Sequence, residues 1–305
     1  MLKVLCESNK IRGNKNNEEN QYLNLIDQII KYGKWEIGRN GRVLAIYGAA
    51  LHFSLEHQKI PILTTKKVAW KTCLRELLWF ISGNTSNATL NQKKVHIWDA
   101  NSSREFLDSR GLNYLDENDL GPIYGFQWRH FNAHYLNCSH NYANEGIDQL
   151  QDVIKCLKDP NLRTSRRMII SSWNPCQLDK MALPPCHVLM QFNVHDGNKL
   201  SCSMYQRSND EACGTPFNIT SYCFLTHLLA KHCNLEPYEF CYFKANCHIY
   251  EDHLEDIKNQ IKREPKEFPT LIINNVYDNI EDYNESDFIL KDYNYHDSIK
   301  YKMIA

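Results

Sequence analysis

The sequence predicts an α+β fold: one domain built on a large mixed β-sheet flanked by helices. Three observations support this fold class. The 305 residues are 43% hydrophobic and 23% charged, which is enough apolar material for one sizeable core. Segments with helical and with strand periodicity alternate irregularly along the chain, without a strict βαβ order. No internal repeat and no Ser/Gly-rich linker divides them, so we expect one folded unit over residues 20–305.

The N-terminal half predicts mostly helices. Residues 1–19 are expected to form a polar leader without fixed structure, because the stretch is rich in Asn, Lys and Glu. Apolar side chains then recur at helical spacing from Asn20 up to Gly33. The further elements expected in this half are a strand at 43–55, a helix at 69–81 ended by Gly83, a long loop at 100–144 and a helix at 147–157.

The C-terminal half predicts most of the sheet. His195-Asp196-Gly197-Asn198 is a hairpin signal between two strand-like runs. The elements expected here are strands at 167–173, 186–194, 200–207, 240–247 and 270–273, and helices at 219–232 and 250–262.

Charge and hydropathy exclude several classes of protein. The 35 Lys and Arg nearly cancel the 36 Asp and Glu, which argues against a bulk nucleic-acid binder. No apolar run approaches the length of a membrane span. No apolar segment follows Met1, so we expect no secretion and a cytoplasmic or nuclear location. The cysteines are accordingly expected to be free thiols.

The 12 cysteines do not predict a metal site, because no Cys-x-x-Cys pair occurs. Cys186 differs from the others, since it follows Pro184-Pro185 and opens an apolar strand. The residue is either a buried thiol or a nucleophile, and a nucleophile requires a nearby cation. If the strand around 188–190 pairs with the one before Arg207, that arginine approaches Cys186.

Two further motifs have both a structural and a functional interpretation. Arg166 and Arg167 are either ordinary surface charges or an anion site, and a strand would point them to opposite faces. Asn218 is either the N-cap of the following helix or an amide that reads a planar base.

Together, these motifs resemble the thymidylate synthase family over roughly residues 20–305. The stretches that carry the resemblance are Thr64–Lys67, Glu76–Phe80, Ile97–Asn101, Gly121–Phe131, Arg166-Arg167, Trp173–Pro175, Ala182–His187, Tyr205–Asp210, Pro216–Ile219, His248–Tyr250 and Arg263–Pro265.

The resemblance implies a reaction and its catalytic residues. A thiolate matching Cys186 adds to C6 of dUMP, and C5 then takes a methylene group and a hydride from 5,10-methylenetetrahydrofolate, which leaves dTMP and dihydrofolate. Glu76 matches the carboxylate that manages protons, with Tyr124 and His187 nearby, and Asn218 matches the amide that reads uracil. Folate supplies both carbon and hydride, so no metal and no redox cofactor are expected.

The resemblance also assigns binding residues. The dUMP ligands would be Arg39, Arg166, Arg167, Arg207, Ser208, Asp210, Asn218, His248 and Tyr250. The folate pocket would be formed by Ile97, Trp98, Asn101, Asp210, Gly214, Phe217 and Met303. The family forms sheet-to-sheet homodimers with shared sites, in which Arg166 and Arg167 come from the partner subunit.

Some positions depart from the family pattern. The phosphate loop, Gly38–Val43, is one residue shorter, so either Arg39 or Arg42 is the phosphate ligand. Ala69, Cys213 and Asn246 also differ, and they bear on folate affinity and turnover. Two alternatives remain: a pyrimidine hydroxymethylase, against which Asn218 and Trp98 argue, and a non-catalytic nucleotide-binding homologue. The sequence does not indicate whether a dihydrofolate reductase is coupled to the chain.

Overall fold

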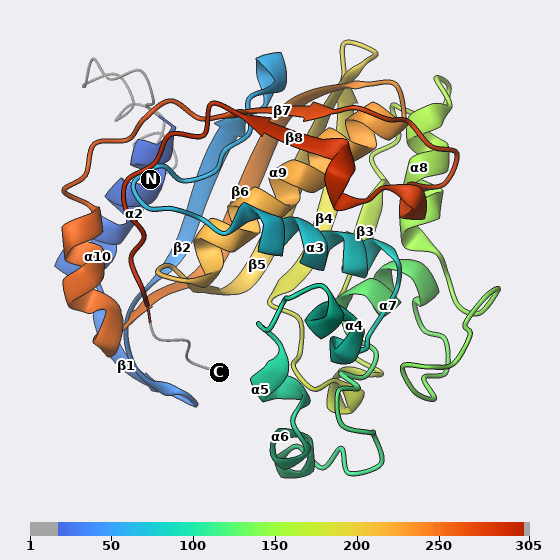
Figure 1. Ribbon diagram of the computed structural model, residues 1–305, viewed down its shortest axis with the longest axis horizontal. Helices are drawn as coiled ribbons and strands as arrows, with labels where there is room; N and C mark the ends of the chain where they lie inside the picture. Colours follow the sequence, from blue (N-terminus) through green and yellow to red (C-terminus); the bar gives the residue numbers. More distant parts are fainter. Residues whose placement is uncertain (1–17, 302–305) are drawn as a thin grey trace.

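The computed structural model describes residues 18–301, and its centre is a six-stranded mixed sheet in the order β1-β2-β6-β5-β4-β3 (Figure 1). The strands are β1 (Lys34–Gly38), β2 (Gly41–Ser54), β3 (Ile169–Ser171), β4 (His187–His195), β5 (Lys199–Asp210) and β6 (Glu236–Tyr250). Within this sheet, only the β5–β6 pair is parallel. The predicted α+β class with a mixed sheet is therefore confirmed.

Helices and a small hairpin cover one face of this sheet. The helix α9 (Gly214–His232) connects the parallel strands and packs on β5 and β6. Figure 1 shows α3 (Trp70–Ile81) lying across α9, with β7 (Thr270–Ile273) and β8 (Phe288–Lys291) above it. Because α9 lies between the sheet and α3, nearly all of its side chains are buried, as expected for a helix that is apolar all round.

The remaining helices are mostly short. They are α2 (Glu19–Tyr32), α4 (Asn87–Gln92), α5 (Asp99–Ser102), α6 (Arg104–Ser109), α7 (Tyr124–His130), α8 (Gln149–Lys158) and α10 (Leu254–Gln260). Three of them, α5, α6 and α7, lie in the stretch that we expected to be a loop. The periodicity could not reveal them, since each is at most two turns long.

Several predicted boundaries change. The strand β1 was not expected, and β6 is longer at both ends than the predicted strand at 240–247. The interpretation of Asn218 as an N-cap is wrong, because α9 begins at Gly214 and tolerates Pro216 within its first turn. Most of the expected polar leader lies outside the described residues; its last residue, Glu19, is the first residue of α2 and is buried.

The predicted hairpin is confirmed, and its geometry aligns β4 with β5. Asp196 and Gly197 both have positive φ, of 48° and 82°, as a type I′ turn requires. The turn sets the antiparallel register as far as Leu189 opposite Tyr205, and an irregularity between His187 and Leu189 then places His187 opposite Gln206. On the other side, β5 and β6 run parallel and place Asp210 beside His248. The start of β4 therefore meets the ends of β5 and β6 at one place.

Candidate active site

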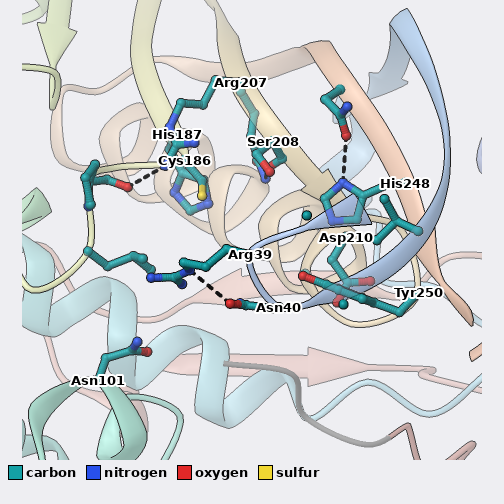
Figure 2. A pocket seen from close by; sticks show the side chains of 18 of the residues that line it. Arg39, Asn40, Asn101, Cys186, His187, Arg207, Ser208, Asp210, His248 and Tyr250 are labelled. Atoms are coloured by element: carbon teal, nitrogen blue, oxygen red, sulfur yellow. Dashed lines mark hydrogen bonds between the residues drawn. The ribbon is translucent and has the colours of Figure 1, made fainter. Parts of the chain in front are cut away.

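A cavity of about 710 Å³ opens where these strand ends meet. It is lined by Glu36, Ile37, Gly38, Arg39, Asn40, Gly41, Val43, Glu76, Ile97, Trp98, Asn101, Arg110, Leu183, Pro184, Cys186, His187, Gln206, Arg207, Ser208, Asp210, Gly214, Asn218, Asn246, His248 and Tyr250. Figure 2 shows Cys186 and Arg207 on one side of this pocket and His248, Asp210 and Tyr250 on the other.

Cys186 stands immediately before β4 and is held through its backbone. Its N–H donates to the Tyr124 hydroxyl at 2.7 Å, and its carbonyl accepts from the N–H of Arg207 at 3.0 Å. The guanidinium of Arg207 donates to the carbonyls of Pro185 and Pro184 at 2.8 and 2.7 Å. The predicted approach of Arg207 to Cys186 is therefore confirmed, and the two prolines supply carbonyls that orient the arginine.

The charge state of Cys186 depends on two opposing effects. Burial raises the pKa of the thiol above its usual value, while the positive charges of Arg207 and Arg39 lower it. Burial dominates, so the thiol keeps its proton at neutral pH in the absence of a ligand. Activation of this thiol therefore requires a group that takes the proton or a change in its surroundings when a ligand binds.

Glu76 is a candidate proton carrier. It projects from α3 into the pocket and accepts a hydrogen bond from the Trp98 indole N–H at 2.7 Å. Burial raises the pKa of this carboxyl to about 7, because only one hydrogen bond compensates for the lost water. A carboxyl with such a pKa can both donate and accept a proton near neutral pH.

The amide of Asn218 has a single defined orientation. The NH₂ group of Gln206 donates to the carbonyl of Ser208 at 2.8 Å and to Asn218 Oδ1 at 3.0 Å. Since a carbonyl only accepts, Gln206 cannot turn its amide over, and Asn218 must place its oxygen toward Gln206. Asn218 Nδ2 then donates to His187 Nε2 at 2.7 Å.

This network also fixes the state of His187. Burial lowers the pKa of His187 to about 4, so the ring is neutral at pH 7. Because Nε2 accepts from Asn218, the ring proton is on Nδ1. One donor and one acceptor position of the Asn218 amide are left for a ligand in the pocket.

The two candidate phosphate arginines occupy different positions. Arg39 lines the pocket, and its guanidinium donates to Asn40 at 2.9 Å (Figure 2). Arg42 instead pairs with Glu251 at 2.8 Å and lies 4.0 Å from the ring centre of Trp35. The geometry therefore favours Arg39 as the anion ligand.

Most of the predicted site residues surround this cavity, but four of those within residues 18–301 do not line it. The Tyr124 hydroxyl contacts the backbone N–H of Cys186 from outside the cavity, and Phe217 packs against the core. Arg166 and Arg167 are exposed in a turn before β3, away from the pocket, which removes the objection that a strand would separate them. Met303 lies outside the described residues.

Some lining residues were not predicted. Glu36 belongs to β1, a strand that the sequence did not reveal, and Arg110 follows α6 in the expected loop. Gln206 stands within the Tyr205–Asp210 motif, and Asn246 is one of the positions that depart from the family pattern. Only their hydrogen bonds identify a role for either residue. The Asn246 side chain is hydrogen-bonded to Glu36 and to His248.

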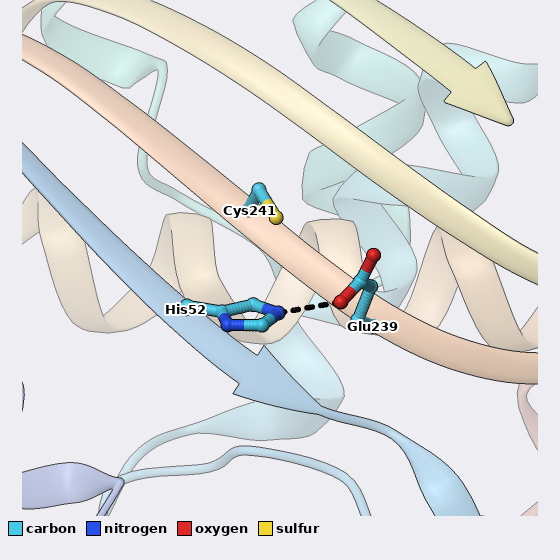
Figure 3. Close-up of side chains that lie close together, drawn as sticks. All are labelled: His52, Glu239 and Cys241. Atoms are coloured by element: carbon cyan, nitrogen blue, oxygen red, sulfur yellow. Dashed lines mark hydrogen bonds and ion pairs between the residues drawn. The ribbon is translucent and has the colours of Figure 1, made fainter. Parts of the chain in front are cut away.

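The cysteines are free throughout residues 18–301, in agreement with the expectation. Two groups of potential metal ligands nevertheless lie close together: His52, Glu239 and Cys241, and Asp210, Cys213 and His253. In the first group, on the face of the sheet away from α9, His52 and Glu239 already form a pair at 2.6 Å (Figure 3). Neither group has the spacing of a zinc motif.

The fold and the pocket define an α+β protein that presents a thiol beside two arginines in a cavity of ligand size. None of its helices between residues 18 and 301 has the length and apolar character needed to cross a bilayer. The chain matches the model of the thymidylate synthase family over residues 20–305. The chain belongs to that family.

Individual relatives agree with this assignment. The chain is 48% identical over 292 residues to a bifunctional dihydrofolate reductase-thymidylate synthase of Leishmania major, covering 95% of this chain and 56% of that protein. It is 50% identical over 293 residues to the corresponding Plasmodium berghei protein, covering 95% and 49%. A probable thymidylate synthase of Schizosaccharomyces pombe is 47% identical over 301 residues, covering 95% and 48%. The chain spans about half the length of these relatives.

Proposed function

We propose that the chain catalyses the reductive methylation of dUMP to dTMP, with 5,10-methylenetetrahydrofolate as donor of carbon and hydride. The observation that carries this proposal is the placement of Cys186 immediately before β4, beside Arg207 and in the same pocket as the Asn218 amide. In the first step, the S–H bond of Cys186 breaks and its proton passes to a base in the pocket. The sulfur bonds to C6 of uracil, and the π electron pair of the C5–C6 bond moves through C5 toward the carbonyl oxygen at C4.

The nucleotide would lie along the row of polar side chains from Arg207 to Tyr250. Arg207, Ser208 and Arg39 would bind the phosphate, since charge-assisted hydrogen bonds are strong in a partly buried site. Asn218 would bind the edge of the uracil, and His248 and Tyr250 the deoxyribose hydroxyl. Asp210 accepts hydrogen bonds from the backbone N–H groups of Ala212 and Cys213. These bonds fix the turn after β5, which would lie beside the base.

Proton transfers would be carried by Glu76. With a pKa of about 7, Glu76 is half protonated near neutral pH and can act in both directions. Tyr124 and His187 support this chemistry by position: Tyr124 holds the backbone of Cys186, and His187 holds Asn218.

Folate would occupy the part of the cavity bounded by Ile97, Trp98, Asn101 and Gly214. The Trp98 ring lies beside Tyr124, with ring centres 6.0 Å apart, and offers a flat surface at the reacting end. We assign Phe217 an indirect role, because it does not line the cavity.

A homodimer would complete the site. The sheet face opposite α9 exposes Phe243, Tyr205 and Leu189, which are neighbours in register across β6, β5 and β4, with 46%, 37% and 36% of each residue accessible. Ile169 on β3, which pairs with Gln191 on β4, lies on the same face and is 42% exposed. Such an apolar face suits a symmetric contact with a second copy. Arg166 and Arg167 would then reach the partner's phosphate site.

The proposal is tested by trapping with 5-fluoro-dUMP and methylenetetrahydrofolate. Fluorine cannot leave C5 as a proton does, so the complex should stall as a covalent adduct on Cys186, visible by mass spectrometry of the intact protein. The variant Cys186→Ser should form no adduct, while Cys176→Ser, which removes an exposed thiol outside the pocket, should form it normally.

The product distinguishes the hydroxymethylase alternative. Mass spectrometry of the nucleotide formed from dUMP should show a methyl group and not a hydroxymethyl group. Nucleotide binding without an adduct or turnover would contradict the proposed reaction and favour a non-catalytic role.

A further inference from the structure

Glu36, Asn246 and His248 form a chain of hydrogen bonds along one wall of the pocket. Asn246 precedes His248 by two positions on β6, so both side chains are on the same face of the sheet. His248 Nδ1 and Asn246 Oδ1 are 2.8 Å apart, and Figure 2 draws this bond at one ring nitrogen of His248. Asn246 Nδ2 donates to Glu36 Oε2 at 3.3 Å, across from β1.

The chemistry of the three groups fixes the direction of every bond. An ionised carboxylate only accepts, so Glu36 requires the NH₂ end of the Asn246 amide. The amide oxygen then faces His248, and an oxygen only accepts. The ring proton of a neutral His248 must therefore be on Nδ1, which leaves Nε2 as an acceptor.

We propose that Glu36 and Asn246 are positioning residues that hold His248 in the Nδ1–H tautomer, so that the pocket selects a ligand with a hydroxyl donor at His248. The inference rests on the proposed function for the identity of that hydroxyl, the 3′-hydroxyl of a deoxynucleotide. The tautomer itself follows from the geometry, whatever the ligand.

An asparagine at position 246 suits this role better than an aspartate does. The charged groups around His248 are Asp210 on β5, Glu211 after it, Lys244 on β6 and Glu36 on β1. Burial and Lys244 lower the pKa of His248, while the three carboxylates raise it, and the net effect is a lowered pKa. A fourth carboxylate at position 246 would favour the imidazolium, whose Nε2 donates and cannot accept.

The tautomer can be read directly by ¹⁵N NMR of the histidine rings in the ligand-free protein. In the wild-type protein at pH 7.5 we expect a protonated Nδ1 and an unprotonated Nε2 for His248, assigned by its loss in His248→Gln. Glu36→Lys replaces an acceptor with a donor, so the Asn246 amide should turn over and the proton should move to Nε2. Glu117→Lys makes the same charge change at a remote exposed position and should leave the tautomer unchanged.

A wild-type His248 that carries its proton on Nε2, or an unaltered tautomer in Glu36→Lys, would overturn the inference. These outcomes do not depend on catalysis. Failure of the trapping experiment with 5-fluoro-dUMP would contradict the proposed reaction and leave the tautomer of His248 unaffected. Normal trapping together with a proton on Nε2 would contradict only the tautomer.

The functional consequence is measured with a pair of nucleotides. dUMP carries a 3′-hydroxyl, which can donate or accept a hydrogen bond, whereas 3′-deoxy-3′-fluoro-dUMP offers only an acceptor at that carbon. We expect the wild-type protein to prefer dUMP by about fivefold to tenfold, measured as the ratio of the two Kd values, which is the value of one hydrogen bond. Glu36→Lys should reduce this preference, because a protonated Nε2 of His248 can donate to either group. The preference should persist in Glu117→Lys, and an undiminished preference in Glu36→Lys would contradict the assigned role.

Discussion

The buried carboxyl of Glu76 lowers the free energy of unfolding when it ionises. Its pKa of about 7 exceeds the ordinary value of 4.5. Between about pH 4.5 and pH 7, the carboxyl is therefore protonated in the folded protein and ionised in the unfolded chain. The free energy of unfolding contributed by Glu76 therefore decreases as the pH rises from about 4.5 to about 7 and stays low above it.

The variant Glu76→Gln tests this directly. Glutamine keeps an oxygen for the Trp98 N–H but carries no charge, so it should raise the free energy of unfolding at pH 8 by about 1–3 kcal/mol relative to wild type. At pH 5 the two proteins should be about equally stable. Urea unfolding at both pH values measures this, and turnover of dUMP should fall sharply in the same variant. Equal stability at pH 8 would show that the carboxylate is not desolvated.

A second residue-scale prediction concerns the ion pair between Lys244 and Glu211. Both side chains are fully buried, and Lys244 Nζ lies 2.6 Å from Glu211 and 2.9 Å from the Thr215 hydroxyl. Lys244→Met leaves a buried carboxylate without its cation and should lower the free energy of unfolding by about 3–5 kcal/mol. The double variant with Glu211→Gln should recover most of this loss. A double variant as unstable as Lys244→Met would mean that the charge is not the cause.

At the scale of elements, the segment before α7 is fixed by a glycine. Gly121 has a φ of +73°, and a Cβ there would lie 2.2 Å from the carbonyl oxygen of Lys180. Gly111 has the same φ of +73° with nothing within 4 Å of its Cβ position. The two positions therefore differ in steric contact and share the backbone conformation.

This difference yields a matched pair of substitutions. Gly111→Ala should lower the free energy of unfolding by about 1 kcal/mol, the cost of a left-handed conformation for alanine. Gly121→Ala should cost more, at least about 2 kcal/mol, because backbone at residue 180 must move as well. Thermal or urea unfolding of the two variants decides the matter, and equal losses would show that the Lys180 contact relaxes freely.

Elements with strong local signals could be predicted from the sequence, and elements defined by partners could not. The hairpin at 195–198 and the buried helix in α9 each have their signal in consecutive residues. By contrast, β1 is short, exposed along its length and made a strand by pairing with β2. The motifs likewise indicated Cys186, Arg207 and Asn218, whereas the roles of Glu36 and Asn246 depend on a hydrogen bond between strands distant in sequence.

At the scale of the whole molecule, the proposed dimer makes each site dependent on two chains. A subunit with Arg166→Ala and Arg167→Ala retains Cys186, and a subunit with Cys186→Ser retains both arginines. If the arginines act on the partner's site, one functional site forms in each mixed dimer.

Mixing the two inactive variants after dissociation and refolding should therefore restore a substantial part of wild-type turnover. Each variant refolded alone should remain weak or inactive. Absence of recovery, with mixed dimers demonstrated by mass, would show that Arg166 and Arg167 serve their own chain. The further variant Tyr205→Glu, on the exposed sheet face, should reduce dimer formation in light scattering and abolish the recovery.

The orientation of the Asn218 amide is determined by the main-chain carbonyl of Ser208, acting through Gln206. A carbonyl of the backbone is present whatever amino acid occupies position 208, so point mutation there cannot reverse the hydrogen-bonding pattern. Uracil offers an N–H beside a carbonyl, whereas cytosine offers an unprotonated nitrogen beside an amino group. An evolutionary change of base preference therefore cannot proceed through gradual rotation of this amide. Under the proposed function, it requires a substitution at Asn218 or at Gln206, the side chain through which the Ser208 carbonyl fixes the amide.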